Sequence, residues 1–165
     1  MFKAVFITFV LLFITIFNVG AHAHTAQTTP IVGAAQYKHY LPQLQNKRVG
    51  LVVNQTSLVE NTHLVDALLT KNITITKIFA PEHGFRGDHD AGAHVKNAVD
   101  SKTGIPLISI YGKNKTPSAE ALSEVDVIIF DIQDVGVRFY TYISSMHYMM
   151  EAAAEQGVEF IVLDR

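Results

Sequence analysis

The chain contains no cysteine, has little charge of either sign and shows no internal repeat. Without cysteine, a disulfide-stabilised small protein and a zinc or iron–sulfur site with thiolate ligands are excluded. The 13 basic and 15 acidic residues give a formal net charge of −2. No electropositive surface is therefore expected, and binding to nucleic acid or anionic lipid is disfavoured. Because 48% of the 165 residues are hydrophobic, the sequence predicts one ordinary globular domain rather than a disordered chain.

The N-terminus carries a hydrophobic run over residues 4–17, with Lys3 before it and Ala21-His22-Ala23 after it. This run is shorter than the roughly 20 residues that a membrane-spanning helix needs. A basic start, a short apolar stretch and a small-x-small site are typical of a secretory signal peptide. We therefore expect residues 1–23 to be removed, the mature chain to be periplasmic or extracellular, and no membrane attachment after cleavage. Residues 24–44 are polar or mixed in character and are predicted to be an N-terminal tether.

Buried-strand and amphipathic-helix patterns alternate from residue 45 to the last residue. Apolar runs predict strands at 49–53, 73–79, 106–111, 125–130 and 159–163. Helical spacing predicts a helix from Leu64 to Leu69, with a cap at Asn61 or Thr62, and further helices at 118–122 and 141–156. This alternation predicts an α/β fold over residues 45–165, in which a Rossmann-like, doubly wound, mainly parallel sheet has helices on both faces.

Polar residues follow the expected strands, at the edge where doubly wound sheets bind ligands. They are Asn54, Gln55, Glu82, His83, Tyr111, Asp131, Gln133, Asp134 and Asp164. The turn after the first strand has no glycine, and neither GxGxxG nor GxxxxGK[ST] occurs in the chain. Since these motifs let the backbone approach phosphates, a dinucleotide or ATP enzyme is disfavoured and no cofactor is predicted.

The densest polar cluster spans residues 81–94 and reads PEHGFRGDHDAGAH. Glu82 and His83 supply acid/base capacity, and Arg86 supplies a cation that can hold a carboxylate through two hydrogen bonds. Two other interpretations stay open. The segment can be an ordinary solvated loop, or it can bind a metal through His83, Asp88, His89, Asp90 and His94, although the spacing fits no helical HExxH motif.

A second cluster, DIQDVGVRFYTY, spans residues 131–142. Asp131 and Asp134 can bind sugar hydroxyls, and Tyr140 and Tyr142 can stack on sugar rings. The structural alternative is that one aspartate caps the following helix while Arg138 neutralises the other.

Three segments resemble the NamZ-like exo-β-N-acetylmuramidases: FAPEHGFRG at 79–87, AGA at 91–93 and the second cluster at 131–142. The similarity runs from about Val49 to the last residue. The resemblance implies an exported glycoside hydrolase that removes N-acetylmuramic acid from the non-reducing ends of peptidoglycan fragments during cell-wall turnover and recycling. It also implies a Rossmann-like N-terminal domain, a smaller C-terminal domain, and an active site between them. The family's proposed catalytic glutamate corresponds to Glu82.

Glycoside hydrolases usually use two carboxyl groups, about 5 Å apart in retaining enzymes and roughly 6.5–9.5 Å apart in inverting ones. Glu82 would be one, with His83 beside it, and Asp131 or Asp134 the second, unless the N-acetyl group of the substrate assists. Arg86 or Arg138 would bind the lactyl carboxylate. Further substrate-binding candidates are Asn54, Gln133, Tyr140 and Tyr142. No metal and no oligomeric state are predicted.

The chain ends at Val162-Leu163-Asp164-Arg165, within what is a longer motif in the family, so we expect a truncated sequence without the C-terminal domain. Muropeptides or disaccharides derived from peptidoglycan are the expected partners. The alternative is a non-catalytic periplasmic module that binds peptidoglycan or another carbohydrate. The presence of Glu82 favours the enzyme, and a metal-dependent hydrolase is a third possibility.

Overall fold

The structure, a computed structural model, describes residues 30–86 and 98–165. The chain divides into two units, Met1–Pro30 and Ile31–Arg165, and the description below concerns the second. The predicted signal peptide at 1–23 lies outside the described residues. Among those residues, no helix is long and apolar enough to cross a membrane.

A six-stranded sheet forms the centre of the second unit, with the spatial order β5-β6-β4-β1-β7-β8. The strands are β1 (Val49–Val53), β4 (Ile75–Ala80), β5 (Ala98–Val99), β6 (Pro106–Ser109), β7 (Val127–Asp131) and β8 (Glu159–Val162). All neighbouring pairs are parallel except β5 with β6. The parallel strands, counted along the chain, thus lie in the order 3-2-1-4-5, which is the arrangement of a doubly wound Rossmann-like sheet. The predicted fold class is confirmed.

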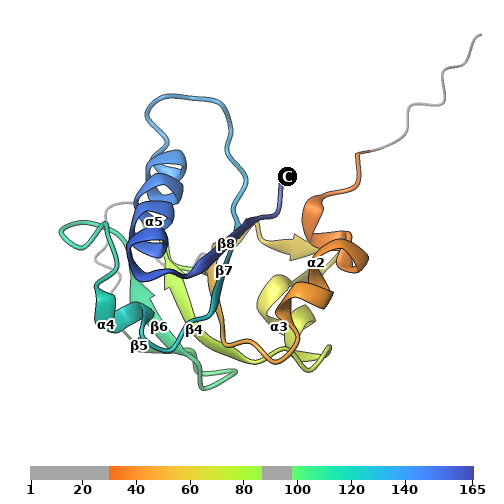
Figure 1. The fold of residues 1–165 in the computed structure, drawn as a ribbon. Coiled ribbons are helices and arrows are strands. Elements are labelled where there is room, and N and C mark those ends of the chain that lie inside the picture. Colours follow the sequence, from red (N-terminus) through yellow and green to blue (C-terminus); the bar gives the residue numbers. More distant parts are fainter. Residues whose placement is uncertain (1–29, 87–97) are drawn as a thin grey trace, which may run out of the picture. The chain divides into compact units, whose positions relative to one another are not determined.

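Helices cover both faces of this sheet (Figure 1). They are the 3₁₀ helix η1 (Gly33–Ala35), α2 (Tyr37–Leu44), α3 (Leu64–Leu69), α4 (Ala119–Leu122) and α5 (Tyr142–Gln156). One hydrophobic cluster joins the sheet to α2 and α3, and a second joins it to α4 and α5. Leu51 belongs to the first cluster and its neighbour Val52 to the second, because successive side chains of a strand point to opposite faces. This double burial explains the uninterrupted apolar run of β1.

The segment predicted as a tether differs from that expectation over residues 31–44. It forms η1 and α2, and Tyr40 and Leu44 are buried in the first cluster. The Tyr40 hydroxyl donates a hydrogen bond to the carbonyl of Ala34 at 2.7 Å. The Gly33 N–H donates to the carbonyl of Asp164 at 2.6 Å, which ties the segment to the chain after β8. Apolar residues four apart share one face of a helix, and this spacing of Tyr40 and Leu44 outweighs the polar composition around them.

A small antiparallel hairpin, β2 (Leu58–Val59) with β3 (Thr62–His63), precedes α3 and has no counterpart in the sequence analysis. The predicted cap of α3 at Asn61 or Thr62 is wrong. His63 is the N-cap, and its Nδ1 accepts a hydrogen bond from the N–H of Val65 at 3.3 Å. Asparagine and threonine are the commoner N-cap residues. Here Thr62 belongs to strand β3, so the helix begins only after His63, and an imidazole nitrogen accepts the capping hydrogen bond.

Candidate active site

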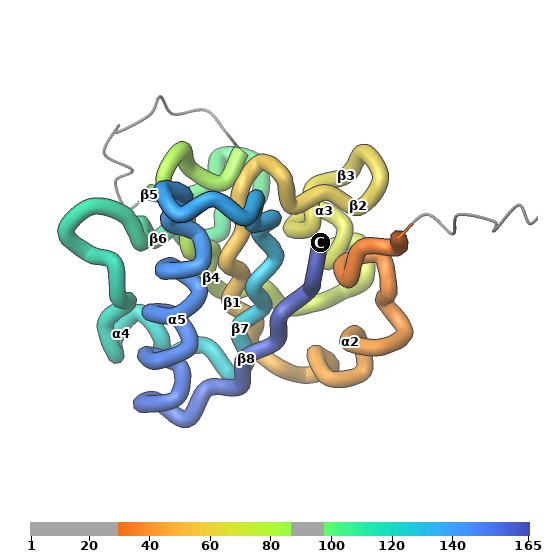
Figure 2. Tube along the Cα trace, turned by 90° about the horizontal axis from the view of Figure 1, so that it is seen from above, coloured from red at the N-terminus to blue at the C-terminus, as the bar shows by residue number. Residues whose placement is uncertain are grey.

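The carboxyl ends of β1, β4 and β7 come together at one edge of the sheet. Figure 2 shows these strands between α5 on one side and α2 and α3 on the other. The strand order reverses between β1 and β7, the position at which doubly wound sheets form a ligand-binding crevice. A cavity of about 550 Å³ lies here, within the size range of small-ligand sites. The segments that follow the three strands supply its walls: Asn54, Gln55, Thr56, Glu82, His83, Gln133, Val135, Phe139, Tyr140, Thr141 and Tyr142.

The cavity brings together most of the polar residues that the sequence analysis selected. Glu82, His83, Asn54, Gln133, Tyr140 and Tyr142 all line it. The other four candidates, Asp131, Asp134, Arg86 and Arg138, are not among the described residues that line it. Within the described part of the chain, Glu82 is therefore the carboxylate of this cavity.

Glu82 sits in a tight turn directly after β4. The turn spans Pro81–Gly84 and is closed by a hydrogen bond from the Gly84 N–H to the Pro81 carbonyl at 3.2 Å. His83 occupies its third position with a φ of 72°, a left-handed conformation that non-glycine residues rarely adopt. Such strain persists only where the surroundings hold it, and it is frequent at functional sites. The turn therefore positions Glu82 and His83 at the carboxyl end of β4, in the wall of the cavity.

Tyr111, which lies on the segment after β6, binds the Glu82 carboxylate. Its hydroxyl donates a hydrogen bond to Glu82 Oε1 at 2.8 Å. This bond raises the pKa of the Tyr111 phenol, since a phenolate would lose the proton that the carboxylate accepts. Tyr111 was expected at this edge of the sheet but not as a partner of Glu82.

Asn54 presents an unpaired donor in the cavity wall. The residue is 0% exposed, and its Oδ1 accepts hydrogen bonds from the N–H of Thr56 at 2.9 Å and from Thr56 Oγ1 at 2.7 Å. These two donors identify Oδ1 as the oxygen, so Nδ2 is the donor end of the amide. Nδ2 is buried and makes no hydrogen bond of good geometry within the described residues, although the Asn54 amide is close enough to the Tyr142 hydroxyl to lower the pKa of that group. A buried polar group without a good partner is costly, and a shift of the Asn54 side chain toward the cavity would let a ligand oxygen satisfy it.

Three aromatic residues, joined by two ring contacts, form the wall of the cavity on the side of α5. Phe139 and Tyr140 have ring centroids 5.7 Å apart, and Tyr140 and Tyr142 form an edge-to-face pair at 5.9 Å. Phe139 is 81% exposed and Tyr140 41%, whereas Tyr142 is buried. Burial raises the pKa of Tyr142, an effect that the nearby Asn54 amide opposes. Exposed ring faces beside a polar cavity suit the stacking of sugar rings.

Asp131, the last residue of β7, is buried in an ion pair and does not line the cavity, in contrast to its predicted role as a catalytic carboxylate. Its side chain is 0% exposed, and its two oxygens accept hydrogen bonds from Arg165 Nε at 2.5 Å and Nη2 at 2.9 Å. Arg165 also donates to the carbonyl of Leu58 at 2.7 Å. Burial raises the pKa of Asp131, and the Arg165 guanidinium counteracts this rise. Arg165 was not among the predicted site residues. The signal that could have indicated it is an arginine just after one strand and an aspartate at the end of the neighbouring strand, since β7 and β8 are paired.

Asp134 and Arg138 lie on the segment between β7 and α5. Asp134 accepts a hydrogen bond from the N–H of Gly136 at 3.3 Å, and it lines a separate cavity of about 280 Å³ between α5 and the end of β8. Arg138 is exposed. The predicted cap of the following helix is wrong, because Thr141 is the N-cap of α5 and makes no side-chain cap bond.

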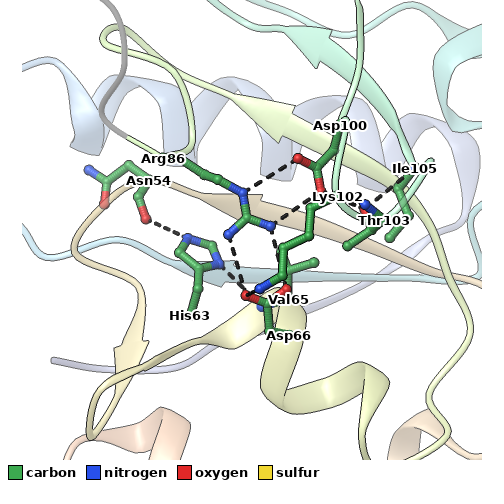
Figure 3. A network of polar contacts seen from close by, with 9 residues as sticks. All are labelled: Asn54, His63, Val65, Asp66, Arg86, Asp100, Lys102, Thr103 and Ile105. Carbon is green, nitrogen blue, oxygen red and sulfur yellow. Dashed lines mark hydrogen bonds and ion pairs between the residues drawn. The ribbon is translucent and has the colours of Figure 1, made fainter.

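Arg86 belongs to a network of ion pairs with Asp66 and Asp100 (Figure 3). Its guanidinium contacts Asp100 at 3.2 Å and Asp66 at 3.4 Å, and Lys102 contacts Asp66 at 2.7 Å. Burial alone would raise the pKa of both carboxyls, but hydrogen bonds from Lys102, Arg86 and Thr103 hold them below their usual value. The predicted contact of Arg86 with a substrate carboxylate is thus replaced by two carboxylates of the protein.

His63 connects this network to the cavity wall. Its Nε2 lies 3.0 Å from the carbonyl of Asn54, and its ring meets Phe85 edge-to-face at a centroid distance of 5.3 Å. Since Nδ1 accepts from Val65, Nε2 carries the proton and the ring is neutral. Burial lowers the His63 pKa, which agrees with that neutral form. His63 thereby fixes the backbone of Asn54.

The metal-binding alternative falls mostly outside the described residues. His83 is described, but Asp88, His89, Asp90 and His94 are not, and neither is the AGA segment at 91–93. Among residues 30–86 and 98–165, no group of three or more histidine, aspartate or glutamate side chains could hold a metal ion.

Comparison with known proteins relates this cavity to one family. The family described as "Exo-beta-N-acetylmuramidase NamZ, N-terminal" matches residues 49–165, which include all three strand ends of the cavity. The chain belongs to this family. A relative from Bacillus subtilis (strain 168), described as "Peptidoglycan beta-N-acetylmuramidase NamZ", is 52% identical over 130 residues, which are 76% of this chain.

Two solved structures share the fold of the NamZ N-terminal domain seen here. Both are described as a DUF1343 family protein from Bacteroides fragilis NCTC 9343. One is 46% identical over 82% of this chain with a TM-score of 0.70, and the other is 43% identical over 81% with a TM-score of 0.73. The chain spans 31% of the length of the Bacillus relative and 34% of each solved chain. It thus corresponds to about a third of these relatives.

Proposed function

We propose that this chain supplies the catalytic part of a peptidoglycan-acting glycoside hydrolase that releases N-acetylmuramic acid from non-reducing ends. The observation that carries the proposal is the position of Glu82. Among the described residues, Glu82 is the carboxylate that lines the cavity where the strand order reverses. The Tyr111 hydroxyl donates a hydrogen bond to it. The name of the Bacillus relative supports the same substrate class.

In the proposed reaction, the Glu82 carboxyl group donates a proton to the glycosidic oxygen as the bond between that oxygen and the anomeric carbon breaks. The leaving sugar takes the proton and departs as an alcohol. Water then adds its oxygen to the anomeric carbon, and its released proton returns to Glu82. His83, held next to Glu82 by the strained turn, would position the substrate or the water.

Asn54 and the aromatic wall would recognise the sugar. The buried Asn54 Nδ2 is a donor that suits the carbonyl oxygen of an N-acetyl group. Tyr140 would stack on the ring, and Gln133 would bind hydroxyls. For the lactyl carboxylate we propose Arg138 rather than Arg86, because the guanidinium of Arg86 already pairs with Asp66 and Asp100. Arg138 does not line the cavity itself, but it is exposed and directly precedes Phe139 and Tyr140, which do.

We further propose that the protein is exported and acts in cell-wall recycling. The hydrophobic run at 4–17, followed by Ala21-His22-Ala23, supports export. Mass spectrometry of the mature N-terminus after expression in a bacterium tests this, and the expected first residue is His24. An intact Met1 in the secreted or periplasmic fraction would contradict it.

The test of the substrate class is the release of nitrophenol from the β-N-acetylmuraminide and from the matching β-N-acetylglucosaminide. We would use both this chain and the full-length protein that its gene encodes. Cleavage of the muraminide alone is expected. Binding of muramic-acid fragments without cleavage of either substrate would instead support the non-catalytic binding module.

A further inference from the structure

A second cavity adjoins the first at Glu82. It measures about 420 Å³, and its walls come from the segment after β6 and from the first two turns of α5. Its lining includes Glu82, Tyr111, Lys115, Thr141, Ser144 and Tyr148. Glu82 and Thr141 line both cavities, so the carboxylate stands where the two cavities meet.

We infer that this second cavity is the subsite for the leaving sugar, an N-acetylhexosamine. The inference rests on the proposed function and deepens it. A group that protonates a glycosidic oxygen must lie between the sugar that is released and the sugar that leaves, because that oxygen joins the two. A carboxylate shared by two neighbouring cavities has this position.

The relative sizes of the cavities assign the sugars. N-acetylmuramic acid is N-acetylglucosamine enlarged by a lactyl ether, and the larger cavity, of about 550 Å³, also holds the buried Asn54 donor. The smaller cavity, of about 420 Å³, suits a sugar without the lactyl group. The muramoyl residue therefore occupies the cavity at β1 and β7, and the leaving sugar occupies the cavity at α5.

The chemistry of the smaller cavity fits a sugar with several hydroxyl groups. Thr141 and Ser144 provide hydroxyls that donate and accept, and Lys115 provides a cationic donor. Tyr111 and Tyr148 provide rings for the faces of the sugar. The Tyr111 hydroxyl is committed to Glu82 at 2.8 Å, so the same residue that orients the proton donor also borders the leaving sugar.

Two substrates that differ only in the leaving group test this subsite. The muramoyl-N-acetylglucosamine disaccharide fills it with hydroxyl groups, whereas the nitrophenyl muraminide presents a flat ring without them. The variants are Lys115→Met and Ser144→Ala, and Lys113→Ala is the matched control, because Lys113 is exposed and outside both cavities. Each variant is made in the full-length protein that the gene encodes, and circular dichroism is used to compare the folding of the variants.

We expect kcat/KM for the disaccharide to fall about tenfold in each variant, as expected for loss of a good hydrogen bond. For the nitrophenyl substrate we expect a change of less than about twofold. Added N-acetylglucosamine should inhibit the unaltered protein and Lys113→Ala, and it should inhibit the two variants less. Equal losses on both substrates, or no loss on the disaccharide, would overturn the subsite and leave the proposed function standing. No cleavage of either substrate by the unaltered protein would overturn the proposed function, and the subsite with it.

Discussion

The buried pair of Asp131 and Arg165 gives the sharpest stability prediction. The side chains are 0% and 8% exposed, and two hydrogen bonds join them. Asp131→Ala leaves the Arg165 charge buried without its partner, and breaking such a pair typically costs about 3–5 kcal/mol. With an m-value of about 2 kcal/mol per molar urea, the unfolding midpoint should fall by about 1.5–2.5 M.

A double-mutant cycle in urea at pH 7 measures this effect. Asp131→Ala and Arg165→Met should each be strongly destabilising, and the double variant should recover much of the loss, since both charges are then removed. Asp126→Ala is the control, because the pair of Asp126 with Arg48 is exposed and its loss should change the midpoint far less. A change of under about 1 kcal/mol for Asp131→Ala would refute the structural role given to Asp131.

Four further predictions concern Arg86, His63, Arg138 and Gly33. Arg86→Leu should lower the free energy of unfolding by about 2–3 kcal/mol, as for lost hydrogen bonds to charged groups, and urea titration checks this against Lys113→Ala. Because burial keeps the pKa of folded His63 below its usual 6.5, the free energy of unfolding should rise with pH up to about 6.5 and then level off. Urea titrations of His63→Gln from pH 5 to 8 should show a smaller rise. An unchanged pH dependence in this variant would contradict the buried, neutral state of His63. Arg138→Ala should raise KM for the muraminide about tenfold with kcat little changed, and an unaltered KM would exclude Arg138 as the lactyl-binding residue. Gly33→Ala should lower the melting temperature, because the added Cβ would lie 2.8 Å from the backbone nitrogen of Asp164; an unchanged melting temperature would mean that η1 is not held there.

The strands of the sheet and the helices that follow them were predictable, because their hydrophobic patterns lie within short stretches of the sequence. The run Val49–Val53 is apolar throughout, and the helix Tyr142–Gln156 ends at a glycine in the left-handed conformation. The N-terminal helix α2 was not predicted, since its two buried residues, Tyr40 and Leu44, are a weak signal among polar neighbours and Pro42. Its stability comes from packing against distant parts of the chain, which composition does not reveal.

The same distinction applies to the site. Strand ends locate Asn54, Glu82 and Gln133 on one edge, because parallel strands present their carboxyl ends together. The partners of charged residues could not be predicted in this way. Arg86 pairs with Asp100, 14 positions along the chain, and Asp131 pairs with Arg165, 34 positions along. Both charged groups resembled substrate-binding residues in the sequence, and the fold uses them to support the cavity.

If Glu82 is the proton donor of a glycosidase, Glu82→Gln should abolish most of the activity without unfolding the protein. We would measure kcat/KM on the muramoyl disaccharide for the unaltered protein, Glu82→Gln and Asp134→Asn, with urea unfolding to show that each is folded. We expect a loss of at least about 100-fold for Glu82→Gln, the scale of general acid catalysis, and a change of less than about twofold for Asp134→Asn. Full activity of a folded Glu82→Gln protein would contradict the account.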